Sequence, residues 1–293
     1  MIHPVVTILG FLWIFVFSGT PTYARPVSLW EVQHWFILLN DDDSTAGQIN
    51  QQMQRFDMAI LDPDRHSGAD HGKGKPILIA YVSLGEAESY RSYWDRIRDR
   101  PWILWENPDW RGNYFVDVRP GEWQTLLIRD VIPAIVAKGF QGLFLDTLDT
   151  ASSLEEKNPK KYAGSSAAMV RLVREIHNQY PGLFLISNNG LELLPHIAPF
   201  LSGVLVEDLH SMPDFEHGGY RDVPPPDRES KSQLLKETME KYRLPVFVVD
   251  YVARGDERKI RECIERSRRL GFKPYVAEKD LSEIYTFGLE KGS

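Results

Sequence analysis

The chain contains little cysteine and no excess of basic residues. Of its 293 residues only Cys263 is a cysteine, so no disulfide can form within the chain. Cys263 lies in a helical pattern, which favours a small, half-buried side chain over a nucleophile. The formal net charge is −7 at pH 7, whereas a nucleic-acid-binding domain carries a basic stripe. We therefore expect no nucleic-acid partner.

Long apolar runs are absent except near the N-terminus. The run over residues 4–17 is shorter than the roughly 20 apolar residues that cross a bilayer. Small and polar residues follow it, and residues 22–24, Thr-Tyr-Ala, resemble a signal-peptidase site. His3 is the only potentially basic side chain before the run. We expect residues 1–24 to be a signal peptide for secretion or export to the periplasm, with an uncleaved membrane anchor as the alternative.

Several catalytic motifs are also missing. The sequence has neither a GxSxG turn nor an HExxH helix. The glycine- and lysine-rich segment 68–75 lacks the spacing of a phosphate-binding P-loop and is interpreted as a solvated turn. His66 and His71 lie near several aspartates, but their spacing matches no familiar metal-ligand pattern. We expect neither a metal nor a cofactor.

Short apolar runs alternate with amphipathic segments after residue 30. Eight runs predict strands: 34–40, 56–62, 76–85, 142–149, 182–190, 203–209, 244–252 and 273–280. Helical patterns between them cover 125–139, 166–180, 231–243 and 257–271. Strands that are apolar on both faces and alternate with helices are typical of a parallel sheet. We therefore predict an α/β fold, a (β/α)8 TIM barrel that residues 25–293 form as a single domain.

Two segments do not belong to this alternation. The run 113–118 is a ninth strand candidate, which we assign to an elaborated loop or short extra strand between the third and fourth barrel strands. The proline-rich segment 222–230 is predicted to be a loop within the domain. A doubly wound open sheet is the alternative architecture, but no glycine-rich phosphate loop follows the first strand to support it.

Polar residues follow nearly every predicted strand, at the end where a barrel of this kind builds its active site. Asp146 and Glu207 each come directly after three apolar residues, so their carboxyl groups should converge at the mouth of the barrel. Glycoside hydrolysis needs such a pair, one protonated as the acid and one ionised as the nucleophile or base. For Asp62, Asn189 and Asp208, capping of the following helix explains the residue type at least as well.

Tryptophans gather between the third and fourth predicted barrel strands. They are Trp94, Trp102, Trp105, Trp110 and Trp123. Flat aromatic faces above the mouth could stack on sugar rings, although core packing is the simpler role for any one of them.

Five blocks of the sequence resemble glycoside hydrolase family 114. They are AYVSLGEAESYRSYW (80–94), GFQGLFLDTLD (139–149), LISNNG (185–190), VLVEDL (204–209) and VFVVDY (246–251). This family contains endo-α-1,4-polygalactosaminidases and the hydrolase module of Pel polysaccharide systems. The resemblance implies a (β/α)8 barrel that cleaves α-1,4 linkages in galactosamine-rich polysaccharides outside the cytoplasm.

The resemblance also implies residue roles. The catalytic Asp and Glu of the family fall on Asp146 and Glu207, the pair that the strand ends already indicate. By the same resemblance the sugar subsites would be lined by Asp62, Tyr81, Glu86, Asn188, Asp250 and Tyr251. The acidic members of this set favour a cationic amino-sugar polymer as the partner, and we expect the protein to be a monomer.

The expected mechanism is retaining, with Asp146 as the nucleophile and Glu207 as the acid and base. It requires the two carboxyl groups to lie about 5–5.5 Å apart, whereas about 6.5–9.5 Å would indicate inversion. Two alternatives stay open. A non-catalytic carbohydrate-binding barrel would bind the polymer without producing new reducing ends, and a barrel glycosidase of another specificity would cleave a different sugar or linkage.

Overall fold

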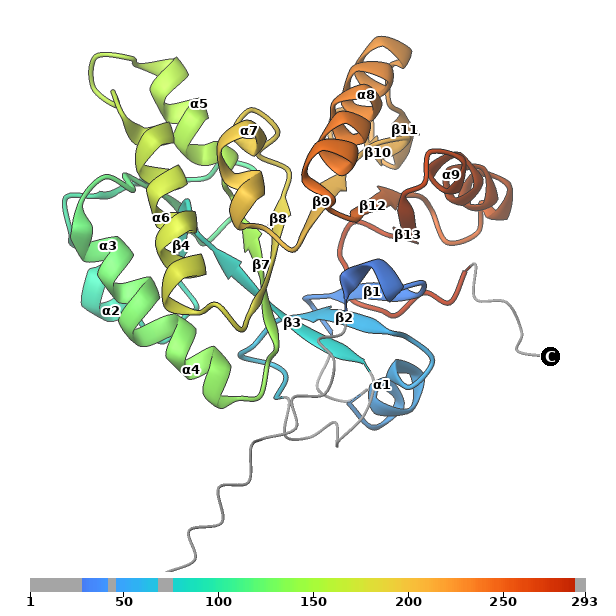
Figure 1. The fold of residues 1–293 in the computed structure, drawn as a ribbon, viewed down its shortest axis with the longest axis horizontal. Coiled ribbons are helices and arrows are strands. Elements are labelled where there is room, and N and C mark those ends of the chain that lie inside the picture. Colours follow the sequence, from blue (N-terminus) through green and yellow to red (C-terminus); the bar gives the residue numbers. More distant parts are fainter. Residues whose placement is uncertain (1–27, 42–45, 68–75, 288–293) are drawn as a thin grey trace, which may run out of the picture.

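The centre of the protein is a sheet of eight parallel strands, seen in a computed structural model that describes residues 28–41, 46–67 and 76–287 (Figure 1). In sheet order the strands are β1 (Trp35–Leu38), β2 (Met58–Leu61), β3 (Ile77–Ser83), β7 (Gly142–Asp146), β8 (Phe184–Asn188), β9 (Gly203–Glu207), β12 (Val246–Tyr251) and β13 (Lys273–Ala277). Each lies within one of the eight predicted runs. The (β/α)8 barrel is therefore confirmed.

The two outer strands of this sheet, β1 and β13, close the barrel through side chains and neighbouring loops. Lys273 Nζ donates to the carbonyl oxygens of Trp30 and Val32 at 3.0 and 2.6 Å. Trp35 Nε1 donates to the Lys273 carbonyl at 3.1 Å, and the Leu39 N–H donates to the Leu281 carbonyl at 3.0 Å. These bonds hold the first and last strands together, so the sheet is nearly closed.

The helices cover the outside of the sheet, as Figure 1 shows. They are α1 (Ala46–Met53), α3 (Gly121–Leu126), α4 (Ile132–Ala137), α5 (Asp149–Lys157), α6 (Ser165–Gln179), α7 (Leu194–Ile197), α8 (Pro225–Tyr242) and α9 (Glu257–Arg269), with short 3-10 turns at Leu29–Glu31 and Ala198–Phe200. A π-helical turn, Leu127–Val131, joins α3 to α4 into one helical stretch. In α6 the buried side chains recur every three or four residues, which turns one apolar face to the strands.

Helix ends follow the local signals in the sequence. Two of the predicted helical patterns, 125–139 and 257–271, end on glycines, and both Gly139 and Gly271 adopt the left-handed backbone that is common just after a helix, with φ of 90° and 81°. The prediction that 222–230 is a loop is wrong. Helix α8 begins at Pro225. Proline suits the first position of a helix, because an N–H there would have no partner within the helix and because the fixed φ of proline is helical.

The segment between β3 and β7 is elaborated, as predicted. It contains β4 (Glu86–Glu88), β5 (Ile103–Glu106) and β6 (Asn113–Val116), an antiparallel sheet in the order β4-β6-β5, together with the short helix α2 (Trp94–Ile97). A second small antiparallel pair, β10 (Ser211–Pro213) and β11 (Tyr220–Asp222), follows β9. Both additions follow the carboxyl ends of barrel strands, so they lie around the mouth.

The tryptophans of this elaborated segment divide between core and surface. Trp102 and Trp123 are buried, and their rings lie 5.7 Å apart. Trp105 and Trp110 are exposed, and Lys157 Nζ lies over the Trp105 ring. The predicted signal peptide, 1–24, and the glycine-rich segment 68–75 lie outside the described residues.

Candidate active site

Three neighbouring strands bring the predicted carboxyl pair together. Asp146 ends β7, Asn188 ends β8 and Glu207 ends β9. These strands pair in parallel, β7 with β8 and β8 with β9, so their carboxyl ends reach the same rim of the barrel. Asp146 and Glu207 are partly exposed there, whereas Asn188 between them is buried.

The side chains on this rim form one chain of hydrogen bonds. Tyr81 Oη donates to Asp146 Oδ2 at 2.9 Å, and Tyr251 Oη donates to Glu207 Oε2 at 2.6 Å. Between them, Asn188 Nδ2 donates to Asp146 Oδ1 at 2.7 Å and to Glu207 Oε1 at 2.6 Å. Five of the eight predicted site residues are thus in direct contact. The chain runs from β3 to β12 and leaves both carboxyl groups held by two neutral donors.

The shared amide limits the distance between the two carboxyl groups. Because Oδ1 of Asp146 and Oε1 of Glu207 both accept from the same nitrogen, they cannot lie farther apart than the sum of the two bond distances, about 5.3 Å. Retaining glycosidases have their carboxyl groups about 5–5.5 Å apart, and inverting enzymes about 6.5–9.5 Å. The geometry is therefore on the retaining side of this division.

The residue after each of these three strand ends has a left-handed backbone. Thr147, Asn189 and Asp208 have φ of 58°, 45° and 57°. None is glycine, and such conformations cost of order 1–3 kcal/mol and concentrate at functional sites. The turn they make directs the chain away from the strand at once, so the side chains of Asp146, Asn188 and Glu207 come last on their strands and meet at the rim.

Close packing holds these turns in place. Thr147 Oγ1 accepts the Gly85 N–H at 2.8 Å, and Asn189 Oδ1 accepts the Glu207 N–H at 3.2 Å. A Cβ on Gly85 would lie 2.2 Å from the Thr147 carbonyl oxygen, so only glycine fits there. Gly85, Thr147 and Asn189 were not among the predicted site residues. The only feature of the sequence that could have indicated them is the presence of polar residues directly after the strands.

Burial and a neighbouring charge favour the protonated form of Glu207. Burial raises the pKa of Glu207, and the charge of Asp146 raises it further, although hydrogen bonds from Tyr251 and Asn188 oppose the shift. Burial and the neighbouring carboxylates also raise the pKa of Tyr81 and Tyr251 well above the usual value, so both phenols stay protonated donors. Glu207 is thus suited to hold a proton.

Further carboxyl groups surround the pair. Burial raises the pKa of Glu86 to about 7, and that of Asp208 to about 7 with the charge of Glu207 adding to the effect. The pKa of Asp149, the first residue of α5, is raised by burial and by the charge of Asp146. The mouth is therefore crowded with acidic groups that repel one another's ionisation.

The remaining predicted site residues lie around the rim in different ways. Asp62 is buried and accepts from Arg91 at 2.9 Å. Glu86 is buried at the start of β4 and accepts from Asn107 at 2.9 Å. Asp250 has no exposed surface, and its Oδ1 accepts the backbone N–H groups of residues 209–211 at 2.6–3.1 Å. Asp250 therefore holds the segment that follows Glu207 and does not face the mouth.

Arg91 is a supporting residue that the sequence reasoning missed. Its Nη1 lies 2.9 Å from Asp62 and 3.0 Å from Asp64, and its Nε lies 2.7 Å from Glu88. The guanidinium also lies over the ring of Tyr81, 5.7 Å from its centroid. Arg91 thus joins the segment after β2 to the segment after β4, behind Tyr81. The sequence feature that could have indicated Arg91 is its position in the segment 80–94, where it is the single arginine close to two glutamates.

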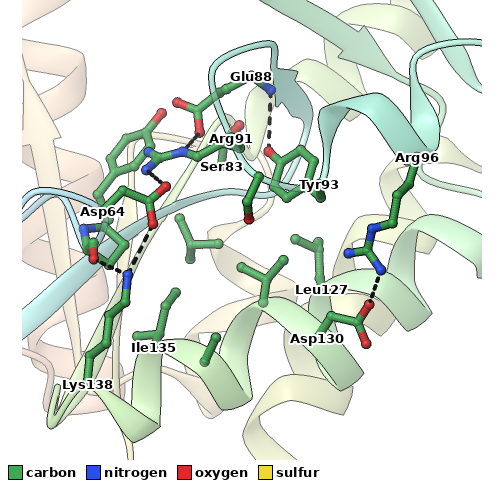
Figure 2. Close-up of a pocket in the computed structure, with 16 residues that line it drawn as sticks. Asp64, Ser83, Glu88, Arg91, Tyr93, Arg96, Leu127, Asp130, Ile135 and Lys138 are labelled. Atoms are coloured by element: carbon green, nitrogen blue, oxygen red, sulfur yellow. Dashed lines mark hydrogen bonds and ion pairs between the residues drawn. The ribbon is translucent and has the colours of Figure 1, made fainter.

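A cavity of about 140 Å³ lies outside the barrel wall, between the 88–96 segment and the 127–138 helical stretch (Figure 2). Figure 2 shows ion pairs at its edge, Lys138 with Asp64 and Arg96 with Asp130, at 3.2 and 2.9 Å. Neither carboxyl group of the rim pair lines this cavity. Tyr81 lines it, so the cavity lies next to the candidate active site but does not contain the carboxyl pair.

No group of three or more His, Cys, Asp or Glu side chains in 28–41, 46–67 and 76–287 is arranged to hold a metal ion. Within the same part of the chain, no helix has the length and apolar character that a membrane span requires.

A (β/α)8 barrel with a close carboxyl pair on neighbouring strand ends is the architecture of many glycoside hydrolases. Comparison with known proteins agrees. The family model described as glycoside-hydrolase family GH114 matches residues 19–291. The chain therefore belongs to family GH114 and is a glycoside hydrolase.

Individual relatives cover most of the chain. An uncharacterized protein of Deinococcus radiodurans is 28% identical over 287 residues, which cover 90% of this chain and 86% of the relative. The glycoside hydrolase domain of PelA from Pseudomonas aeruginosa is 25% identical, with a TM-score of 0.72 over 86% of this chain and 97% of that domain. Ega3 of Aspergillus fumigatus, solved in complex with galactosamine, shares the fold at 14% identity, with a TM-score of 0.63 over 85% of this chain and 92% of that structure.

Proposed function

We propose that this glycoside hydrolase cleaves α-1,4 linkages in galactosamine-containing polysaccharide with retention of configuration, and that Asp146 and Glu207 are its catalytic residues. The observation that carries the proposal is the shared Asn188 amide, which holds one oxygen of each carboxyl group within about 5.3 Å of the other. This spacing supports retention, because an inverting enzyme needs a wider gap in which a water molecule fits between its carboxylate base and the sugar.

The proposed reaction has two steps. In the first, protonated Glu207 donates to the glycosidic oxygen while Asp146 attacks the anomeric carbon, so the bond to the leaving sugar breaks and a glycosyl ester forms on Asp146. In the second, Glu207 takes a proton from water, and the oxygen of that water displaces Asp146 from the anomeric carbon. The raised pKa of Glu207 supports its role as the acid of the first step.

The neutral donors on the rim position the pair. Tyr81 and Asn188 each donate to one oxygen of Asp146, which supports an orientation of the nucleophile that a single donor could not define. Tyr251 and Asn188 do the same for Glu207. We propose that Asp62 and Glu86 influence the subsites from behind these residues, since both are buried and already accept hydrogen bonds.

The charge of the mouth supports a cationic sugar. Asp146, Asp149, Glu207 and Asp208 stand within one region of the rim, and the pKa of each of the last three is raised in part by a neighbouring carboxylate. The ammonium group of galactosamine would lower this repulsion, whereas an N-acetyl group would not. Membership of family GH114 supports the same sugar, and the galactosamine bound to Ega3 concerns a protein of the same fold.

The experiment compares α-1,4-linked galactosamine polymers that differ only in N-acetylation, with new reducing ends as the readout. We expect cleavage to increase with the fraction of free amine, and Asp146→Asn and Glu207→Gln to abolish it. Asp130→Asn is a matched control, because Asp130 makes a surface ion pair with Arg96 outside the mouth. Full activity in either catalytic variant would overturn the assignment of the pair.

Other outcomes would identify the alternatives. Binding of the polymer without any reducing ends would indicate a carbohydrate-binding barrel, and cleavage only of a different polysaccharide would indicate another specificity. The stereochemistry is read separately by proton NMR of the first product. We expect the α-anomer to appear before mutarotation, and an initial β-anomer would contradict retention.

We further propose that residues 1–24 are an export signal and that residues 25–293 form the hydrolase domain. The support is the apolar run over 4–17 with the Thr-Tyr-Ala sequence after it. N-terminal sequencing of protein recovered from outside the cytoplasm tests this, and we expect the mature chain to begin at Arg25. An intact Met1 in the exported protein would support the anchor instead.

A further inference from the structure

A second concave site lies on the helical layer, between α8 and α9. It is a groove of about 460 Å³, within the range of small-molecule sites. Figure 1 shows the two helices on the side of the barrel formed by β9, β12 and β13. The lining residues are His210, Arg228, Glu229, Ser232, Gln233, Lys236, Arg266, Arg269 and Leu270. None of the rim residues of the candidate active site is among them.

The groove is strongly cationic. Four of its lining residues, Arg228, Lys236, Arg266 and Arg269, are basic, and only Glu229 is acidic, although the whole chain has a net charge of −7. The helix repeat explains this concentration. On each helix the lining residues recur three or four positions apart, so their side chains extend from one face.

Part of the hydrogen-bonding capacity of the groove is unused. Arg266 Nη2 pairs with Glu262 at 2.5 Å, but its Nη1 is buried and has no hydrogen-bond partner among the described residues. His210 is 2% exposed, and its Nε2 lies 3.0 Å from Ser267 Oγ. The other ring nitrogen, Nδ1, is buried and likewise lacks a partner in the described chain. Buried polar atoms normally have partners, which a ligand or its water can supply.

The lowered pKa of His210 also reflects the positive charge of the groove. Burial, together with the charges of Arg266 and Arg228, lowers its pKa to about 4. The imidazole is therefore neutral at neutral pH and is surrounded by cations. If Ser267 Oγ–H donates to Nε2, the proton of the ring is on Nδ1, which makes that nitrogen a donor at the end of the groove.

We propose that the groove between α8 and α9 binds a small multivalent oxyanion, a phosphate monoester or diphosphate group carried by a soluble molecule or by a lipid headgroup. Guanidinium groups present paired donors that match such oxygens, and three arginines with one lysine converge here. The proposal is independent of the proposed hydrolysis, because the mouth binds through acidic groups and the groove through basic ones.

Isothermal titration calorimetry with pyrophosphate tests the proposal. The ionic strength is held constant with sodium chloride. We expect saturable binding at one site. The double variant Lys236→Gln/Arg269→Gln removes two exposed charges from the groove and should weaken binding roughly tenfold. Glu229→Gln removes the only acidic lining residue and should strengthen binding.

A matched control separates this groove from the general charge of the surface. Lys241→Gln/Arg261→Gln removes the same charges from the same two helices at positions that do not line the groove. We expect it to leave the affinity for pyrophosphate unchanged. Absence of saturable binding, or equal weakening by both double variants, would overturn the proposal.

A second arm distinguishes the two sources of the anion. Vesicles containing phosphatidic acid, whose headgroup is a multivalent phosphate monoester, are sedimented with the protein, with and without pyrophosphate. Sedimentation that pyrophosphate releases and that the groove double variant loses would assign the headgroup. Pyrophosphate binding without sedimentation would assign a soluble ligand. Sedimentation that the groove variant retains and pyrophosphate does not release would contradict a common site.

Discussion

At the mouth of the barrel, Asp146, Asn188 and Glu207 stand on the ends of adjacent strands, whereas the charged groups of the α8–α9 groove are carried on long side chains of two helices. The mouth is acidic, and each rim carboxyl group is held by two donors. The groove is basic, and buried atoms of Arg266 and His210 lack partners within the described chain.

The difference shows how a barrel separates two kinds of site. Strand ends fix the position of a short side chain to within a hydrogen bond, which suits chemistry between atoms that must lie at defined distances. Helix faces gather charge without defining its geometry, which suits recognition of an anion by several long side chains. Variants of the two regions test this contrast.

The largest effect is expected at the mouth, where Asp146→Asn and Glu207→Gln should differ on an activated substrate. On the polymer both should lower kcat by about 10³-fold or more. On an aryl glycoside whose leaving group needs no proton, Glu207→Gln should recover most of the first step and Asp146→Asn none. Pre-steady-state release of the aryl group measures this. Equal losses on both substrates would contradict the assigned roles.

The next effect concerns the stability cost of the crowded acids. Burial raises the pKa of Glu86 from 4.5 to about 7, so the folded state binds its proton more tightly than the unfolded state does. Stability is therefore lost as the pH rises from about 4.5 to about 7. Glu86→Gln keeps an acceptor for Asn107 and should raise the free energy of unfolding above pH 7 by up to about 3 kcal/mol, with little change at pH 4.

Urea unfolding at a series of pH values measures this difference. The exposed helical residue Glu175 provides the matched control, Glu175→Gln, which should follow the wild-type curve at every pH. Parallel curves for Glu86→Gln and wild type would show that burial at this position carries no such cost.

A smaller effect is expected from single donors of the rim. Tyr251 donates to Glu207 and opposes the rise of its pKa. Tyr251→Phe should therefore raise that pKa further, move the alkaline limb of the kcat profile to higher pH and lower kcat about tenfold. Tyr81→Phe removes the matching donor to Asp146 and should leave the alkaline limb in place. A shift of that limb in both variants would indicate a general loss of structure.

The smallest effect is expected from the groove. Lys236→Gln/Arg269→Gln should change kcat and KM on the polymer by no more than about twofold, because exposed charges are screened by salt and none lies on the rim. Steady-state kinetics at about 0.15 M salt measures this. A tenfold change in either constant would break the comparison and show that the two regions act together.

The sequence was informative where the signal is local. Continuous apolar runs identified all eight barrel strands, since strands buried on both faces have no polar alternation. The same runs predicted that Asp146 and Glu207 would converge, because parallel strands end on one side. The start of α8 was misplaced, since three prolines in a row resemble a loop although Pro225 begins the helix.

Some features could not be predicted because they depend on residues far apart in the chain. Asn188 was expected to line a subsite, but its bonds to both carboxyl groups follow from the pairing of β7, β8 and β9. Asp250 ends a strand just as Asp146 does, yet its carboxylate holds the backbone of residues 209–211. Whether a side chain at a strand end faces the mouth or binds the backbone is decided by the residues packed around it.

The sequence by itself determined the barrel, the elaborated segment after β3 and the acidic strand ends, because hydrophobic periodicity and residue type act over a few neighbouring positions. Only the tertiary structure decided the spacing of the two carboxyl groups, the left-handed turns at Thr147, Asn189 and Asp208, and the basic groove between α8 and α9. Those features arise where segments distant in the chain meet, and the pattern of a few neighbouring residues does not predict such contacts.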